Sequence, residues 1–128
     1  SHFFLPIRHF SLIYCFIIIK SHIEVQMADI KITDEEIVDM SDFFKVFGDP
    51  TRLRILFYLW QEEESGVNGI SDALKISQSA VSQQLKLLRA SRLVRFRKDG
   101  RNIIYRLSDD HITKILQLGL EHYDELLG

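Results

Sequence analysis

The sequence predicts a mainly α-helical fold with one small β-hairpin. Apolar side chains recur at helical spacing through most of the chain, and the helical segments are preceded by residues that cap helices. Residues 94–107 break this period, because apolar and polar side chains alternate there on both sides of Asp99-Gly100. A length of 128 residues, with 46% hydrophobic and 27% charged side chains, is ordinary for one soluble globular domain.

The first two predicted helices are separated by a glycine. Residues 33–36 read Thr-Asp-Glu-Glu, a capping box that opens a helix to about Phe47. Gly48 ends this helix, and Asp49-Pro50 starts the next one, with Asp as the cap and Pro in the first turn. We expect the second helix to end in the acidic loop 61–66 and to bury three leucines, Leu53, Leu56 and Leu59.

Two short helices and the hairpin come next along the chain. Residues 68–74 form the first of these helices, residues 75–77 the turn, and residues 78 to about 90 the second helix, which Ser77 caps. The hairpin strands are residues 94–98 and 102–107. A helix, a short turn, a second helix and a hairpin in this order predict a winged helix-turn-helix.

Charge is unevenly distributed along a chain whose net charge is only −2. Residues 75–106 hold nine Lys or Arg and one acid, whereas residues 29–42 hold six acids and one Lys. A basic block in an acidic chain indicates a polyanionic partner for that block. A solvated basic surface, on a helix-turn-helix that binds no DNA, is the alternative.

The second helix of the motif carries side chains suited to DNA. Val81, Leu85 and Leu88 are expected in the core, which turns small hydroxyls and amides outward near the helix start, the end that enters a major groove. Gln pairs with adenine, Ser contacts bases or phosphates, and Lys and Arg contact phosphates. The predicted DNA-binding residues are Gln78, Ser79, Ser82, Gln83 and Lys86 on the helix, and Arg97, Lys98 and Arg101 on the wing.

The last predicted helix covers residues 110–127. Residue types that ligate metals lie just before it and near both of its ends: Asp109, His111, His122 and Glu125. Eleven helical steps return His122 to nearly the face of His111 but separate the two by ~16 Å. Zinc–nitrogen bonds are only ~2 Å long, so one ion cannot join these histidines along one helix. Two copies packed antiparallel would place each His111 beside the partner's His122, giving two symmetric sites in a homodimer.

The composition of this helix supports an interface. Residues 111, 115, 118, 122 and 125 form a heptad stripe with an apolar centre and ligand-type ends. On the opposite side, Ile112, Leu116, Tyr123 and Leu127 are expected to pack on the domain. In the alternative interpretation Asp109 only caps the helix, His111 lies in its first turn and Glu125 is solvated.

Residues 41–127 resemble the ArsR/SmtB-type metal-responsive repressors. The resemblance rests on the segments FKVFGDPTRLRIL (44–56), LKISQSAVSQQLKLLRASRLV (74–94) and KDGRNIIYRL (98–107), and on the Asp-x-His and His-x-x-Glu pairs of the last helix. It implies a dimer that binds operator DNA without metal and leaves it when zinc binds. It also implies that Asp109 and His111 of one protomer ligate zinc with His122 and Glu125 of the other. Family branches that sense metals through thiolates use cysteines near residues 67–74, where this chain has none.

Two nitrogens and two carboxylate oxygens suit four-coordinate Zn²⁺, with Co²⁺ as a laboratory substitute. A closed site with four protein ligands has no open position for a substrate, so we predict no catalytic residues and no enzyme. A winged-helix regulator without a metal response is the main alternative. A metal-dependent hydrolase and a pure dimerisation module are more remote.

Residues 1–26 differ in character from residues 27–128, the predicted DNA-binding and dimerisation domain. The run FSLIYCFIII (10–19) is too short to span a bilayer. We interpret residues 1–26 as an N-terminal extension of doubtful origin, from an upstream translation start or an artificial addition. A membrane-surface anchor and an added dimer helix are the alternatives. The single cysteine, Cys15, excludes a disulfide framework within one chain, and we expect a cytoplasmic protein.

Overall fold

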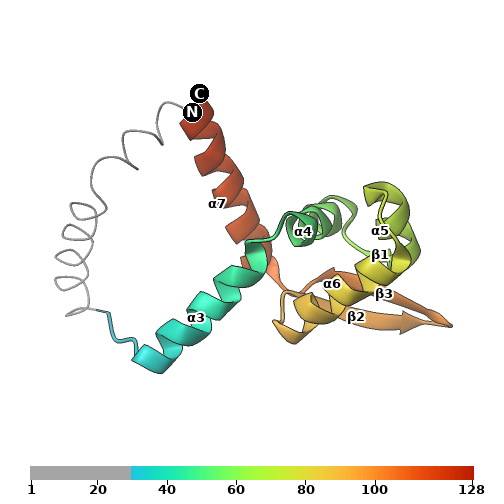
Figure 1. Cartoon of the computed structure of the whole chain (residues 1–128), viewed down its shortest axis with the longest axis horizontal. Helices are drawn as coiled ribbons and strands as arrows, with labels where there is room; N and C mark the ends of the chain where they lie inside the picture. Colours follow the sequence, from blue (N-terminus) through green and yellow to red (C-terminus); the bar gives the residue numbers. More distant parts are fainter. Residues whose placement is uncertain (1–29) are drawn as a thin grey trace. The chain divides into compact units, whose positions relative to one another are not determined.

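The computed structural model describes residues 30–128, so the predicted extension 1–26 lies outside the described residues. The chain divides into two units at Asp39 and Met40, and the second unit contains the buried core. The element labels are those of Figure 1. In chain order the elements are α3 (Asp34–Phe47), α4 (Pro50–Glu62), β1 (Ser65–Gly66), α5 (Val67–Leu74), α6 (Gln78–Ala90), β2 (Val94–Asp99), β3 (Asn102–Leu107) and α7 (Asp110–Leu127).

The helices start where the capping residues predict. Each predicted cap accepts a hydrogen bond from a backbone N–H two or three residues later, which satisfies one of the unpaired donors of a first helical turn. The bonds are Glu36 N to Thr33 Oγ1 (3.1 Å), Arg52 N to Asp49 Oδ2 (2.9 Å), Ala80 N to Ser77 Oγ (3.1 Å) and His111 N to Asp109 Oδ1 (2.8 Å). Local side-chain chemistry therefore sets these four helix starts.

Helices α4, α5 and α6 enclose the core. Its fully buried side chains are Ile55, Leu56, Leu59, Ile70, Val81, Leu85, Leu88 and Leu93. The predicted burial of Leu56, Leu59, Val81, Leu85 and Leu88 is thereby confirmed. Leu53 is only half-buried, because it lies at the wall of an apolar groove formed with α3 and α7.

The wing is a three-stranded antiparallel sheet in the order β1-β3-β2. The predicted hairpin is confirmed, but β2 extends one residue further than expected, because Asp99 pairs with Asn102. The turn residues are therefore Gly100, at φ +62°, and Arg101. A glycine at the first turn position permits this positive φ, as in type II′ hairpins. Strand β1 was not predicted: Ser65 and Gly66 pair with Tyr105 and Ile104 within the segment expected to be a loop.

Helix α7 packs on the domain with only part of its length. Ile112 and Leu116 are buried as predicted. The same prediction is wrong for Tyr123 and Leu127, which are 56% and 64% exposed. The cause is the length of the helix, since its later turns extend past the body of the domain (Figure 1). Within residues 30–128, no helix combines the length and apolar character needed to cross a membrane.

Candidate nucleic-acid interface and metal-ligating residues

A tight turn fixes α6 against α5. Lys75 ends α5 in the left-handed region, at φ +57°, and its backbone N–H bonds to the carbonyl of Ser71. The Ser71 hydroxyl donates to the carbonyl oxygen of Ile76 at 2.6 Å. These bonds satisfy backbone groups at the end of α5, so the turn holds the start of α6 in a defined direction.

Helix α6 separates its core face from its polar face as predicted. Val81, Leu85 and Leu88 are completely buried. The five predicted DNA-binding residues of this helix are all exposed: Gln78, Ser79, Ser82, Gln83 and Lys86. Among them, Ser79, Ser82, Gln83 and Lys86 follow the three- and four-residue spacing of one helix face. The amides and hydroxyls thus form one polar surface with a lysine one turn beyond.

The two faces of the wing differ in their partners. Phe96 lies under α6, where the guanidinium carbon of Arg89 is 3.8 Å from its ring centroid, a cation–π contact. Side chains two residues apart on a strand share a face, so Lys98 lies on the same face of the hairpin as Phe96. Arg101 is exposed in the turn. Lys98 and Arg101 are therefore the wing residues best placed to act together with α6.

Arg97 lies on the opposite face of β2 and already has a carboxylate partner. Its Nη2 is 2.9 Å from Oε1 of Glu64, and its Nε donates to Oε2 of the same residue at 3.4 Å. The hydrogen bond from Arg97 holds the pKa of Glu64 below its ordinary value, and the same bond raises the pKa of Arg97. Both side chains are partly exposed. The sequence did not reveal this pair, because its members lie 33 positions apart and meet only through β1.

A polar hollow joins α6 to the wing tip. Its volume is about 470 Å³. Ser82 lines it from α6, Arg101 and Asn102 line it from the hairpin, and residues 66–69 line it from the end of β1 and the start of α5. Two predicted DNA-binding residues, from separate elements, therefore border one concave surface.

At the start of α7, Asp109 and His111 lie side by side. The Nδ1 atom of His111 is 3.4 Å from Oδ1 of Asp109. This same Oδ1 accepts the backbone N–H groups of His111 and Ile112, as the capping interpretation expects. The other oxygen, Oδ2, accepts no hydrogen bond from the part of the chain that the structure describes. Capping therefore uses one oxygen of Asp109 and leaves the second for another ligand.

The second predicted pair, His122 and Glu125, lies near the far end of α7. Both side chains are exposed and three residues apart, so they face the same side of the helix. Among residues 30–128 of one chain, no three His, Cys, Asp or Glu side chains lie together in a group that could hold a metal ion. The four predicted ligands therefore form two separate pairs in a single chain.

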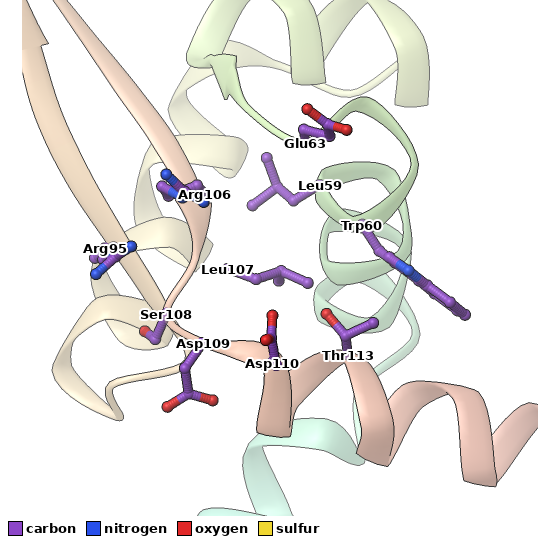
Figure 2. Close-up of a pocket in the computed structure, with 10 residues that line it drawn as sticks. All are labelled: Leu59, Trp60, Glu63, Arg95, Arg106, Leu107, Ser108, Asp109, Asp110 and Thr113. Atoms are coloured by element: carbon purple, nitrogen blue, oxygen red, sulfur yellow. The ribbon is translucent and has the colours of Figure 1, made fainter.

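A further cavity of about 570 Å³ lies between the end of α4, the two long strands and the start of α7. Figure 2 shows Arg95 and Arg106, which are directly opposite across the strands, on one side of it. The carboxylates of Asp109 and Asp110 point in opposite directions in this view. The carboxylates of Asp109 and Asp110 are therefore not directed at a common ligand.

The matched family model is "Bacterial regulatory protein, arsR family", over residues 49–95. A "Transcriptional repressor SmtB homolog" from Synechocystis is 41% identical over 86 residues, which cover 67% of this chain and 64% of that protein's length. The match thus spans less than two thirds of that relative.

Solved structures agree with the observed fold. The AntR antimony-specific transcriptional repressor is 35% identical, with a TM-score of 0.67 over 74% of this chain and 86% of that one. A homodimeric winged helix-turn-helix domain from Mycobacterium bovis has a TM-score of 0.69 at 24% identity, over 77% of this chain and 94% of that one, a likeness of fold alone.

The predicted winged helix-turn-helix is confirmed. The prediction that the chain is not an enzyme is confirmed too, because the matched family is one of regulatory proteins and the similar proteins are transcriptional repressors. With its fold, its motif and these similarities together, the chain belongs to the arsR family of bacterial regulatory proteins.

Proposed function

We propose that this protein is a transcriptional repressor that binds operator DNA as a metal-free homodimer and is released from it by zinc. One observation carries the DNA-binding part. The exposed amide and hydroxyl face of α6 lies beside a basic hairpin tip, with Ser82 and Arg101 bordering the same hollow. This is the arrangement expected when a helix enters a major groove and a wing contacts the adjacent backbone.

The side chains of this interface divide into two kinds. Gln78, Ser79, Ser82 and Gln83 are the proposed base and backbone readers of α6, because amides and hydroxyls both donate and accept hydrogen bonds. Lys86, Lys98 and Arg101 are the proposed phosphate contacts, and Arg97 joins them only when it leaves Glu64. In a dimer, two such helices reach half-sites about one DNA turn apart, ~34 Å, so the operator should be palindromic.

Exposed apolar side chains on α3 and α7 support the homodimer. Met40 and Phe44 on α3, and Leu118, Leu120, Tyr123 and Leu127 on α7, are all at least two-fifths exposed. Between these helices and α4 runs an apolar groove of about 430 Å³. Large apolar side chains exposed in this number mark an interaction site. Leu118 lies at the centre of the stripe that joins His111 to His122.

The metal part of the proposal rests on the two ligand pairs of α7. Each pair supplies one imidazole nitrogen and one carboxylate, so two pairs from different chains provide the four ligands that Zn²⁺ prefers. Asp109 and His111 of one protomer would hold the ion with His122 and Glu125 of its partner. The donor set fits zinc: Asp109 has a free oxygen beside His111, and all four side chains are exposed. When bound, the ion would link the two terminal helices.

Release of DNA requires metal and operator to oppose each other by a coupling free energy, typically ~1–3 kcal/mol. The repressors to which this chain is similar include one named as antimony-specific, which supports a response to a metal or metalloid without choosing zinc. A winged-helix regulator with no metal response is the second candidate. Its support is the capping role of Asp109, which accounts for that residue without any ion. A cytoplasmic location belongs to either proposal.

One experiment tests both parts. Duplexes bound by metal-free protein are selected from a randomised pool, and the affinity for the selected duplex is measured with and without one zinc ion per protomer. We expect a palindromic site, and at least a fivefold loss of affinity with zinc that a chelator reverses. A palindrome whose affinity is unchanged by zinc would favour the second candidate. Failure to select any duplex would contradict DNA binding itself.

A further inference from the structure

The Glu64–Arg97 pair is unusual among the charges of the wing. Residues 75–106 contain nine Lys and Arg, yet within residues 30–128 only Arg97 among them is in an ion pair. None of the other wing cations forms an ion pair with a carboxylate in that part of the chain. Glu64 is therefore the acid that is hydrogen-bonded to a cation of this largely basic surface, while Asp99 acts on Arg97 only through its charge.

The course of the backbone places Glu64 close to Arg97. The chain leaves α4 through Glu63, whose positive φ of +70°, with ψ −47°, is a conformation that non-glycine residues rarely adopt. Glu64 comes immediately after it and leads into β1, which pairs with β3. Because β3 lies between β1 and β2, the Glu64 side chain crosses one strand to reach Arg97 on the next.

The face on which the pair lies is basic. Strand register places Arg95 and Arg106 directly opposite each other, and Arg97 is two residues along β2 on the same face. Arg106 also attracts Glu64, and this contributes to the lowered pKa of the carboxyl. Glu64 stays ionised at neutral pH and presents to Arg97 two oxygens like those of a phosphate.

The pair adds little to the stability of the fold, because ion pairs between exposed side chains contribute very little to the free energy of folding. For an approaching polyanion, however, the pair places a negative charge directly beside the cation. A DNA phosphate that approaches Arg97 must displace a carboxylate and is itself repelled by it. We propose that Glu64 is an electrostatic brake that occupies Arg97 in place of a DNA phosphate and lowers affinity for duplexes of every sequence. This inference rests on the DNA binding proposed above.

The test compares Glu64→Gln with Glu62→Gln. Both variants remove one negative charge from the same short segment, but Glu62 has no ion pair with a described residue. Affinity is measured by fluorescence anisotropy on a labelled mixed-sequence duplex of about 30 base pairs, roughly three helical turns, across a salt series. Glu64→Gln should bind about threefold to tenfold more tightly than Glu62→Gln at ~0.1 M salt. Its dependence of log affinity on log salt should be steeper by about 0.9, the value for one added phosphate contact.

The background Arg97→Gln identifies the cation that is released. In that background, Glu64→Gln should gain no more than Glu62→Gln and should leave the salt slope unchanged. Equal gains from both glutamate variants with Arg97 present would overturn the brake while leaving DNA binding intact. A gain from Glu64→Gln that persists in full without Arg97 would also overturn it. If neither wild type nor any variant binds the duplex, the proposed DNA binding and the brake fail together.

Discussion

Lysine and arginine occupy the two left-handed positions that border α6. Lys75 closes α5 at φ +57°, and Arg92 lies just beyond α6 at φ +61°. Glycine is the residue normally preferred there, since it has no Cβ to clash. The capping residues were predictable because each acts on its own helical turn. The left-handed lysine was not, because its conformation belongs to the turn between two helices and follows from no property of a lysine side chain.

Replacing Lys75 by glycine should stabilise the fold. Glycine removes the Cβ strain of a left-handed residue, and after its greater flexibility in the unfolded chain is subtracted we expect a gain of roughly 0.5–1 kcal/mol. Urea unfolding followed by circular dichroism measures the change. Lys75→Ala is the matched control, because it removes the same charge but keeps the Cβ. Equal stability of the two variants would show that the turn carries no relievable strain.

The division of the DNA interface into base readers and phosphate contacts makes a second prediction. Gln83→Ala should cost ~1–3 kcal/mol on the selected operator and relax the base preference at one position of each half-site. Arg101→Ala should weaken selected and random duplexes alike and flatten the salt slope by about one. Competition binding with both duplexes measures the difference. If both variants lose the same affinity on both duplexes, the division is mistaken.

At the scale of elements, periodicity predicted what each segment determines for itself. The buried stripe of α6 fixed its exposed face, so the polar surface of this helix could be predicted from its sequence alone. Strand β1 could not, because Ser65 and Gly66 have no strand pattern and become a strand only by pairing with β3. Because β1 was not predicted, the Glu64–Arg97 pair, which depends on it, could not be predicted either. The exposure of Tyr123 and Leu127 was not predicted, because periodicity identifies the face that meets the domain but not how far along the helix the domain extends.

The exposed stripe of α7 should control dimerisation. Leu118 is 64% exposed, so Leu118→Glu should leave the fold of one chain intact while burying a charge in the proposed interface. We expect at least a tenfold weaker dimer by sedimentation equilibrium. Gln117→Glu introduces the same charge at the neighbouring exposed position and serves as the control, although it also removes the hydrogen bond from Gln117 Nε2 to Glu121 Oε1 (3.1 Å) within the same helix. If both variants dimerise equally, α7 does not form the interface along this stripe.

At the scale of the molecule, one chain has two ligand pairs and no complete metal site among its described residues. The sequence predicted the ligand types because Asp, His and Glu are recognisable by chemistry. It also predicted that one helix could not bring them together, since ~16 Å separates His111 from His122 along the axis. The structure of a single chain does not show how two copies are placed relative to each other. The proposed site can therefore be tested only by a property of the dimer.

Complementation between two damaged chains tests that property. His111→Ala and His122→Ala homodimers each have two sites that lack one histidine, so both should bind metal weakly and stay on the operator when zinc is added. In a mixed heterodimer, the intact His111 and the intact His122 lie on different chains. One site then has all four ligands and the other has neither histidine. The heterodimer should regain one tight site, seen as half the cobalt absorption of the wild type with tetrahedral intensity.

This outcome separates a shared site from any site within one chain. If each chain bound metal by itself, mixing would give only the average of two weak homodimers, and no tight site would return. Recovery of half the signal requires that residues of both chains ligate the same ion, which is the arrangement that antiparallel α7 helices produce. A heterodimer without tight metal binding would falsify the shared site. Homodimers that still leave the operator with zinc would place the sensor elsewhere, while the winged-helix interface and its predicted DNA contacts would stand.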